Sequence, residues 1–318
     1  MARVLVTGGA GFIGSHVADL LLDQGHEVSV FDNLATGRRE NVHPRARLHE
    51  VDLRDAEATF RVVEAAQPEY VHHLAAQPNV RISTERPAYD ADVNIIGALN
   101  LLEACHAVGV KRLVYSSSGG AIYGEHGELP LTEDAPIVPI SPYGVSKYTV
   151  ELYLKAANVV WGLEYVILRY ANVYGPRQDP KGEAGVVSLF TDAMLAGEQP
   201  RIFGDGGATR DYVHVSDVAR ANLAAMSARA LNAYNVGTGV QTSVRELFDA
   251  LAAVAGFTVE PIYDDPRPGE IRHSMVDATR LRTDTGWRPE FDLAAGLRDT
   301  FEYYRAKKGT EPLSGKAR

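Results

Sequence analysis

The chain has only one cysteine, no long apolar run and no excess of positive charge. Cys105 lies in an apolar helical pattern, and as a single cysteine it excludes an internal disulfide and a thiolate-rich zinc site. No apolar stretch reaches the length of about 18 residues that spans a bilayer, and MARVLVTGG at the N-terminus lacks the features of a signal peptide. The net charge of -9 argues against a nucleic-acid partner. We therefore expect a cytoplasmic protein without a membrane or nucleic-acid partner.

Metal ligands are also sparse. His72 and His73 are adjacent, but neighbouring residues of a strand point to opposite faces and cannot share one ion. We expect both histidines to be core or strand-end residues, and we expect no metal site.

Apolar segments rich in β-branched residues alternate with helical patterns in the first half of the chain. The alternation predicts βαβ units, and so an α/β fold with a doubly wound parallel sheet of the Rossmann type, covered by helices on both faces. The expected strands are residues 3–7, 27–32, 47–53, 70–76, 112–118 and 163–175, and the expected helices are 12–25, 55–66, 88–108 and 143–160.

The first strand runs into a glycine-rich turn, TGGAGFIG at residues 7–14, which opens the first helix. Gly8, Gly11 and Gly14 permit a sharp turn, close approach of backbone N–H groups to a pyrophosphate, and tight packing of helix on strand. Asp32 ends the second strand 18 residues after Gly14. A carboxylate there can accept hydrogen bonds from the adenosine ribose and repel a 2′-phosphate. The pattern predicts a dinucleotide site that prefers NAD to NADP.

Two features near this site leave alternatives open. Arg38 and Arg39 would favour NADP, but they lie several residues beyond Asp32 in a loop, so we give Asp32 more weight. Asp52 and Leu53 end the third strand and would lie near the adenine, although Asp52 could equally be a residue that flanks the next helix.

The motif SPYGVSK places Tyr143 and Lys147 four residues apart at the start of a helix, so both side chains leave from one face. A free tyrosine has a pKa of about 10, and lowering it to about 7 requires about 4 kcal/mol. A lysine ammonium and a positively charged nicotinamide ring at about 4 to 5 Å would each supply a comparable energy at an effective dielectric near ~20. The spacing alone is common and usually marks a surface tyrosine, but here it follows a dinucleotide loop.

The strand before this helix ends in three serines, Ser116, Ser117 and Ser118, at the carboxyl edge of the sheet. A hydroxyl there can bridge a substrate oxygen and Tyr143. Strand-end capping is the alternative role. Ser117 and Ser118 are both candidates for the bridging hydroxyl.

The regular alternation ends near residue 170. We predict an NAD-binding Rossmann domain over residues 1–170, to which segments near 211–238 return, and a smaller α/β substrate domain over residues 171–318. In the second domain, SLFTDAML and LAAGLRDTFEYYR predict helices, and Ser243 with Glu246 matches a capping box that begins another.

With TGGAGFIG, Asp32, YSSS and YGVSK in this order, the chain resembles the extended short-chain dehydrogenase/reductase family, most closely its UDP-glucose 4-epimerases. Segments such as HLAAQ (73–77), LRYANVYGPRQ (168–178), GDGGATRDYVHVSDVA (204–219) and RPGEIRHSMVD (267–277) extend the resemblance over essentially the whole length. It implies NAD-dependent 4-epimerisation of UDP-hexoses through a transient 4-keto sugar. Tyr143, as phenolate, would take the proton of the 4-hydroxyl while hydride leaves C4 for the nicotinamide.

The resemblance also implies roles for individual residues. Lys147 would hold the nicotinamide ribose and lower the pKa of Tyr143, and Ser118 would orient the sugar 4-oxygen. The expected cofactor-binding residues are Gly8, Gly11, Phe12, Ile13, Gly14, Asp32, Asn33, Asp52, Leu53, Leu74, Ala75, Ala76, Asn94, Tyr143, Lys147 and Tyr170. The expected substrate-binding residues are Ser118, Tyr143, Asn172, Val186, Arg210, Arg267, Glu270 and Ser274.

The chain departs from the family at several points that bear on the reaction. Gln77 and Pro78 stand where many members have a lysine that contacts the cofactor. Gly119 and Gly120 replace the acidic pair of the 4,6-dehydratases, so simple epimerisation is what remains. Ser274 stands where a bulky tyrosine restricts the sugar site in some members, which implies acceptance of UDP-N-acetylhexosamines.

Further expectations concern assembly and competing functions. The helices at 88–108 and 143–160 carry apolar faces that the family uses in a dimer contact, so we expect a homodimer. Epimerisation of UDP-glucuronate and a non-catalytic NAD-binding sensor of the same fold are the competing functions; intact Tyr143 and Lys147 count against the sensor.

Overall fold

A parallel sheet of seven strands forms the centre of the computed structural model, which describes residues 1–180, 185–228, 231–266 and 271–309. Across the sheet the order is β10-β6-β5-β4-β1-β2-β3, and all neighbouring strands run parallel. The chain builds β2 and β3 on one side of β1 and then crosses to β4 on the other side. The strands are β1 (Arg3–Thr7), β2 (Glu27–Asp32), β3 (Arg47–Glu50), β4 (Tyr70–His73), β5 (Arg112–Ser118), β6 (Glu164–Tyr170) and β10 (Ala233–Val236).

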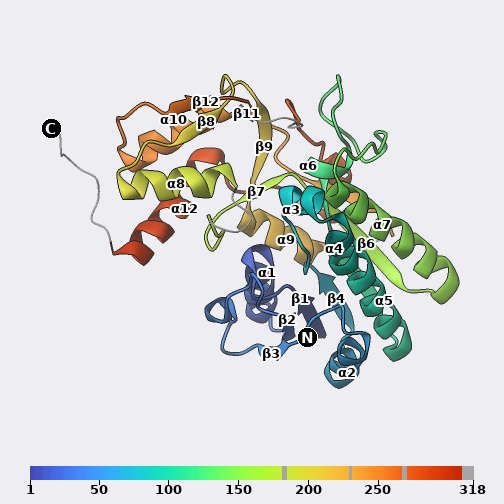
Figure 1. Ribbon diagram of the computed structural model, residues 1–318. Coiled ribbons are helices and arrows are strands. Elements are labelled where there is room, and N and C mark those ends of the chain that lie inside the picture. The colour runs from blue at the N-terminus through green and yellow to red at the C-terminus, as the bar shows by residue number, and fades with distance from the viewer. Residues whose placement is uncertain (181–184, 229–230, 267–270, 310–318) are drawn as a thin grey trace.

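Helices cover both faces of this sheet (Figure 1). Alternating residues of β1 show how the two faces are filled: Leu5 joins a core cluster with residues of α2, α5 and α7, whereas Val4 and Val6 join a cluster with α1 and α9. All three side chains are fully buried, as a strand covered on both faces requires. The predicted Rossmann architecture is confirmed. These helices are α1 (Phe12–Asp23), α2 (Ala56–Ala66), α5 (Gly97–Val108), α7 (Pro142–Trp161) and α9 (Val215–Ala225).

The helix expected at 88–108 is present over residues 87–108, but it contains a π-helical turn. The chain forms α4 (Pro87–Ala91), then a π-helical turn η2 (Asp92–Ile96), and only then α5. A short helix that the sequence pattern did not predict, α3 (Val80–Glu85), comes before them. A π turn shifts the side chains that follow it around the helix axis, and such turns are frequent at functional sites.

The strand expected at 163–175 divides at Ala171. β6 ends at Tyr170 in the main sheet, and β7 (Asn172–Tyr174) begins a second sheet with β9 (Thr209–His214) and β11 (Gln241–Ser243). β3 and β4 are also shorter than expected, because the chain leaves the sheet after Glu50 and after His73. Both departures fall at the carboxyl edge, where the pocket described below lies.

Of the remaining elements, α8, α10 and α12 pack beside the second sheet (Figure 1). A cluster of buried residues joins α8, α10 and α12, and the capping box predicted from Ser243 and Glu246 is present at the start of α10. None of the helices in the described ranges is long and apolar enough to cross a membrane. The elements are η1 (Arg39–Asn41), α6 (Gly119–Ile122), α8 (Val186–Ala196), β8 (Arg201–Phe203), α10 (Val244–Ala255), β12 (Ile262–Asp264), α11 (Thr279–Thr285) and α12 (Leu293–Lys308).

Candidate active site

The glycine turn between β1 and α1 is too tight for side chains. Gly8 has φ +70°, and a Cβ there would lie 2.7 Å from the backbone nitrogen of Ala75. A Cβ on Gly14 would overlap the carbonyl oxygen of Gly8. Gly11 is the N-cap of α1 and has no side-chain cap. The N-terminal end of α1 therefore borders the pocket as bare backbone, the arrangement that receives a phosphate.

Asp32 closes the turn from the second strand. One carboxylate oxygen accepts a hydrogen bond from the backbone N–H of Ala10 at 2.9 Å, and the other accepts one from that of Leu34 at 2.8 Å. Burial raises the pKa of this carboxyl group, while the two backbone hydrogen bonds oppose the rise. Asp32 thus shapes the glycine turn and also lines the pocket, where a ribose can meet its carboxylate.

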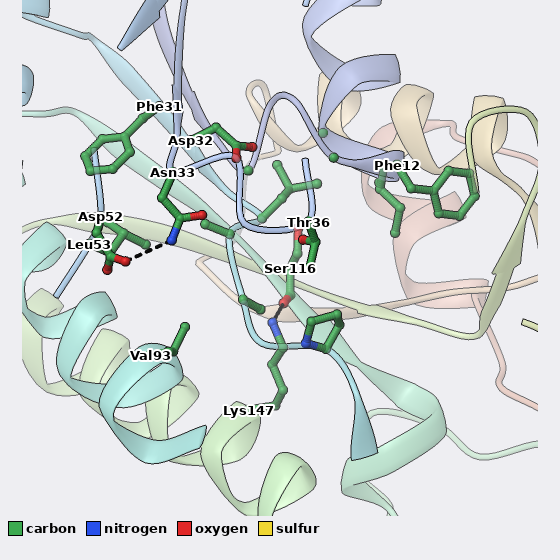
Figure 2. Close-up of a pocket in the computed structure, with 18 of the residues that line it drawn as sticks. Phe12, Phe31, Asp32, Asn33, Thr36, Asp52, Leu53, Val93, Ser116 and Lys147 are labelled. Atoms are coloured by element: carbon green, nitrogen blue, oxygen red, sulfur yellow. Dashed lines mark hydrogen bonds between the residues drawn. The ribbon is translucent and has the colours of Figure 1, made fainter. Parts of the chain in front are cut away.

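A second acidic residue, Asp52, lies beyond Asp32 in the same pocket (Figure 2). Its carboxylate accepts a hydrogen bond from the side-chain amide of Asn33 at 2.8 Å and two from the Arg54 guanidinium at 2.8 and 2.9 Å. The Arg54 guanidinium holds the pKa of Asp52 well below its usual range. Asp52 is therefore ionised at neutral pH and fixed in place as one wall of the pocket.

The two arginines that would favour NADP are engaged elsewhere. Arg38 donates to Asp179 at 2.7 Å, and Arg39 pairs with Glu50. Neither arginine lines the pocket, whereas Asp32 does. The negative charge at the end of β2 therefore decides the electrostatics there, which favours a free ribose over a 2′-phosphate.

The helix that carries SPYGVSK brings its first turns to the same pocket. Ser141 caps α7 by accepting a hydrogen bond from the Gly144 N–H, and the Tyr143 N–H donates to the Ser83 hydroxyl at 3.2 Å. Lys147 is buried, and its ammonium donates to the backbone oxygen of Ser116 at 2.8 Å (Figure 2). The same ammonium lies 5.8 Å from the centre of the Tyr143 ring. A buried positive charge beside a phenol stabilises the phenolate form.

The three serines at the end of β5 have different surroundings. The Ser116 hydroxyl lies 2.8 Å from the Tyr170 hydroxyl, and the Ser117 hydroxyl donates to Glu151 at 2.6 Å. Ser118 is the last residue of β5 and the N-cap of α6, with no side-chain cap hydrogen bond. Ser116 and Ser117 line the pocket. Ser118, the next residue in the chain, is not one of the lining residues.

The adjacent histidines serve different faces of the sheet. His73 Nδ1 lies 2.8 Å from the Thr7 hydroxyl, and its ring lies beside Tyr115. His72 Nδ1 lies 3.2 Å from the side-chain oxygen of Asn222 on α9. Burial lowers the pKa of His73 to about 3 and that of His72 to about 4, so both rings are neutral at pH 7.

Most of the expected cofactor-binding residues line one pocket at the carboxyl edge of the sheet. They are Gly8, Gly11, Phe12, Ile13, Gly14, Asp32, Asn33, Asp52, Leu53, Leu74, Ala75, Ala76, Tyr143, Lys147 and Tyr170. Asn94 is not among the lining residues. Its side-chain oxygen accepts from the Gln77 N–H at 2.7 Å, and its amide donates to the Gln77 carbonyl and to Asp90. The π turn directs Val93, rather than Asn94, into the pocket (Figure 2).

The pocket also has lining residues that the sequence reasoning missed. They are Phe31, Thr36, Val51, Pro78, Val93 and Ser116. Phe31, Val51 and Ser116 directly precede expected residues near the ends of strands. They could therefore have been predicted from the strand pattern. Val93 required knowledge of the π turn, which hydrophobic periodicity does not reveal.

Tyr143 is the one described substrate candidate that lines this pocket, and Ser118 directly follows two of its lining residues; the other described candidates lie on the second sheet or next to it. Asn172 pairs with Tyr212 of β9, two residues after Arg210. Arg210 donates to the backbone oxygens of Thr209 and Arg272, and the buried Ser274 donates its N–H to Thr209 at 3.2 Å. Val186 begins α8. Arg267 and Glu270 lie outside the described residues.

Comparison with known proteins gives a consistent set of similarities. The NAD dependent epimerase/dehydratase family matches residues 4–237. A putative UDP-glucose 4-epimerase of Methanocaldococcus jannaschii is 48% identical, with 96% of this chain and 100% of that protein covered. A crystal structure of UDP-glucose 4-epimerase with UDP-glucose from Thermotoga maritima has TM-score 0.94 and 50% identity over 96% of this chain and 99% of that one. The Thermus thermophilus UDP-glucose 4-epimerase in complex with NAD has TM-score 0.90 and 48% identity over 95% and 99%.

Proposed function

The chain belongs to the NAD-dependent epimerase/dehydratase family, and on this premise we propose that it interconverts UDP-hexoses at C4 through a transient 4-keto sugar. The expected membership of the extended short-chain dehydrogenase/reductase family, closest to its UDP-glucose 4-epimerases, is confirmed. The observation that carries the proposal is the meeting of Tyr143 and Lys147 with the glycine turn and Asp32 in one pocket.

NAD is the cofactor, and the residues present fit it. The bare turn at Gly8 and Gly14 leaves the end of α1 open to a pyrophosphate, and Asp32 faces the pocket where the adenosine ribose would bind. When bound, NAD would supply the acceptor, and then the donor, of the hydride at C4 of the sugar.

Tyr143 is the group that we assign to the proton of the sugar 4-hydroxyl. The positive charge of Lys147 favours its phenolate, and the hydrogen bond from Lys147 to the Ser116 carbonyl fixes that charge in position. By its resemblance to the family, Lys147 would also hold the nicotinamide ribose. Tyr143 can then take the proton and return it in the reverse step.

We assign the hydroxyl that orients the 4-oxygen to Ser118. The Ser117 hydroxyl already donates a hydrogen bond to Glu151 at 2.6 Å. Its side chain leaves the opposite face of β5 from the side chains of Ser116 and Ser118. Gly119 and Gly120 follow directly and provide no acid or base, which supports simple epimerisation over dehydration. The diphosphate would meet Asn172, Arg210 and the expected Arg267, since a guanidinium can bond two phosphate oxygens at once.

The range of sugars is part of the proposal. Ser274 is small and buried beside Thr209, and we propose that it leaves room for an N-acetyl group at C2 of the sugar. UDP-N-acetylglucosamine and UDP-N-acetylgalactosamine are then substrates together with UDP-glucose and UDP-galactose.

We further propose a cytoplasmic homodimer in which residues 1–170, with segments near 211–238, bind NAD and residues 171–318 supply the substrate contacts. Exposed apolar side chains on η2 and α7 support the dimer, because monomeric proteins rarely expose a large group of apolar side chains to water. They include Ile96, Val145, Leu152 and Tyr153. A monomer in light scattering at micromolar concentration would contradict this assembly.

One assay tests the proposed function. Purified protein is incubated with UDP-glucose, UDP-N-acetylglucosamine and UDP-glucuronate, and each 4-epimer is measured by chromatography. We expect turnover of the first two and little of the third. Turnover confined to UDP-glucuronate would favour the uronate reaction, and no turnover of any of the three would favour an NAD-binding sensor.

A further inference from the structure

Asp90, on α4, is a fully buried carboxylate that the proposed reaction does not use. Three side chains donate hydrogen bonds to it: Gln77 at 2.9 Å, Asn94 at 2.9 Å and Ser146 at 2.6 Å. Together these hydrogen bonds satisfy both carboxylate oxygens, Oδ1 twice and Oδ2 once. Burying a carboxylate is costly, so it persists only where hydrogen bonds satisfy it well.

Two of these hydrogen bonds lead to the wall of the cofactor pocket. Gln77 holds the turn after β4, because its side chain bonds the N–H and the carbonyl of Asn79 as well as Asp90. Pro78, inside that turn, lines the pocket. Asn94 bonds both backbone groups of Gln77, and its neighbour Val93 lines the pocket from the π turn. Asp90 is thus hydrogen-bonded to the residues next to two segments of the wall, Pro78 and Val93.

The third hydrogen bond leads to α7, the helix that carries Tyr143 and Lys147. Ser146 lies in the first turns of α7, between Tyr143 and Lys147 in sequence, and its hydroxyl donates to Asp90. The Tyr143 N–H donates to Ser83 on the neighbouring α3. The first turns of α7 are therefore held by the same α3–α4 segment that supports the wall. Neither Ser146 nor Gln77 lines the pocket itself.

We propose that Asp90 is a positioning residue that sets the start of α7, and with it Tyr143 and Lys147, in a fixed relation to the dinucleotide wall formed by Pro78 and Val93. Its carboxylate joins the two parts, because it accepts hydrogen bonds from Gln77 and Asn94 behind the wall and from Ser146 on α7 at the same time. We call this hydrogen-bonded group the junction. Gln77 gains a role by the same argument: an amide in this position donates to Asp90 and ties the turn, which is a different use from direct contact with a cofactor.

The inference rests on the proposed function, and its consequence is specific. Transfer of a proton and a hydride requires the phenol, the sugar and the cofactor within a narrow geometry, and a misplacement of about 1 Å can cost about 100-fold in rate. Loosening the junction should therefore lower kcat and loosen NAD, while the substrate contacts on the second sheet stay unchanged.

The test uses Ser146→Ala, Gln77→Leu and the double variant in the full-length protein loaded with NAD. The control is Thr300→Val, which removes a hydroxyl from a buried helical position on α12, where that hydroxyl donates to the Gly296 carbonyl in its own helix. For each variant, kcat and KM with UDP-glucose, the rate of NAD release, followed by fluorescence, and the melting temperature are measured.

We expect Ser146→Ala to lower kcat about tenfold, to change KM less than about twofold, and to speed NAD release about three- to tenfold. Because both arms act through Asp90, the double variant should release NAD no faster than about twice the rate of the worse single variant. Thr300→Val should change neither kcat nor NAD release.

Three outcomes would overturn the proposal: unchanged kcat and NAD release in Ser146→Ala, rates in the double variant equal to the product of the single effects, or the same losses in Thr300→Val. The NAD measurement separates this inference from the proposed function. A wild-type protein that turns over no UDP-sugar would refute the function, and NAD release in the four variants would still decide the role of Asp90.

Discussion

Replacing Arg169 with methionine should lower the melting temperature by about 4 to 7 °C. Arg169 on β6 and Glu151 on α7 form a buried ion pair at 2.6 Å, with a second hydrogen bond at 3.1 Å. Removing one partner of such a pair leaves an uncompensated buried charge, at a cost of about 3 to 5 kcal/mol. The 318 residues imply an unfolding entropy of about 0.7 kcal/mol per kelvin, which converts that cost into the stated shift.

The double variant Glu151→Leu with Arg169→Met provides the matched comparison. With both charges gone the core holds only apolar side chains at these positions, so the double variant should melt above Arg169→Met. The hydroxyls of Ser117 and Tyr123 lose partners in it, so it should remain below the wild type. Differential scanning calorimetry measures all three. Arg169→Met within about 1 °C of the wild type, or additive losses in the double variant, would refute this reasoning.

Three further predictions address the turn, pH and the sugar. Gly14→Ala should abolish NAD retention, because its Cβ overlaps the Gly8 carbonyl, whereas Gly127→Ala, with open space around it, should bind NAD normally by fluorescence titration. Calorimetry should show the free energy of unfolding falling between pH 7 and pH 5.5 by about 1.3 kcal/mol for each histidine that stays neutral in the folded protein, because the same histidine takes up a proton near pH 6.5 in the unfolded chain. These histidines are His16, His72, His73 and His214. A flat profile would contradict that assignment. Ser274→Tyr should lower turnover of UDP-N-acetylglucosamine relative to UDP-glucose, and an unchanged ratio would refute the role of Ser274.

The main sheet could be read from the sequence because its strands are buried on both faces and are bounded by glycine or polar turns. The limits of residues 3–7, 27–32 and 112–118 agree with β1, β2 and β5. The strand expected at 163–175 did not reveal its division at Ala171, because aromatic and β-branched residues typical of strands stand on both sides of it while the chain changes sheet. A local hydrophobic pattern indicates that a strand is buried, but it does not indicate to which sheet the strand belongs.

The site was predictable where a motif fixes backbone shape, and less so where long-range packing decides. The glycine turn and the spacing of Tyr143 and Lys147 follow from local geometry, and all of these residues line one pocket. Asn94 is the counterexample. Its place in the sequence suggested cofactor contact, but the π turn at 92–96 directs Val93 to the pocket and Asn94 to Gln77.

The most direct test of the account is the rate of UDP-glucose to UDP-galactose conversion by Tyr143→Phe, measured with its NAD content and its melting temperature. The variant removes only the hydroxyl that we assign to the proton transfer. We predict a loss of at least about 100-fold in kcat, the effect of removing a general acid–base, with NAD content and melting temperature close to those of the wild type. A variant that epimerises UDP-glucose at the wild-type rate would contradict the catalytic role of Tyr143.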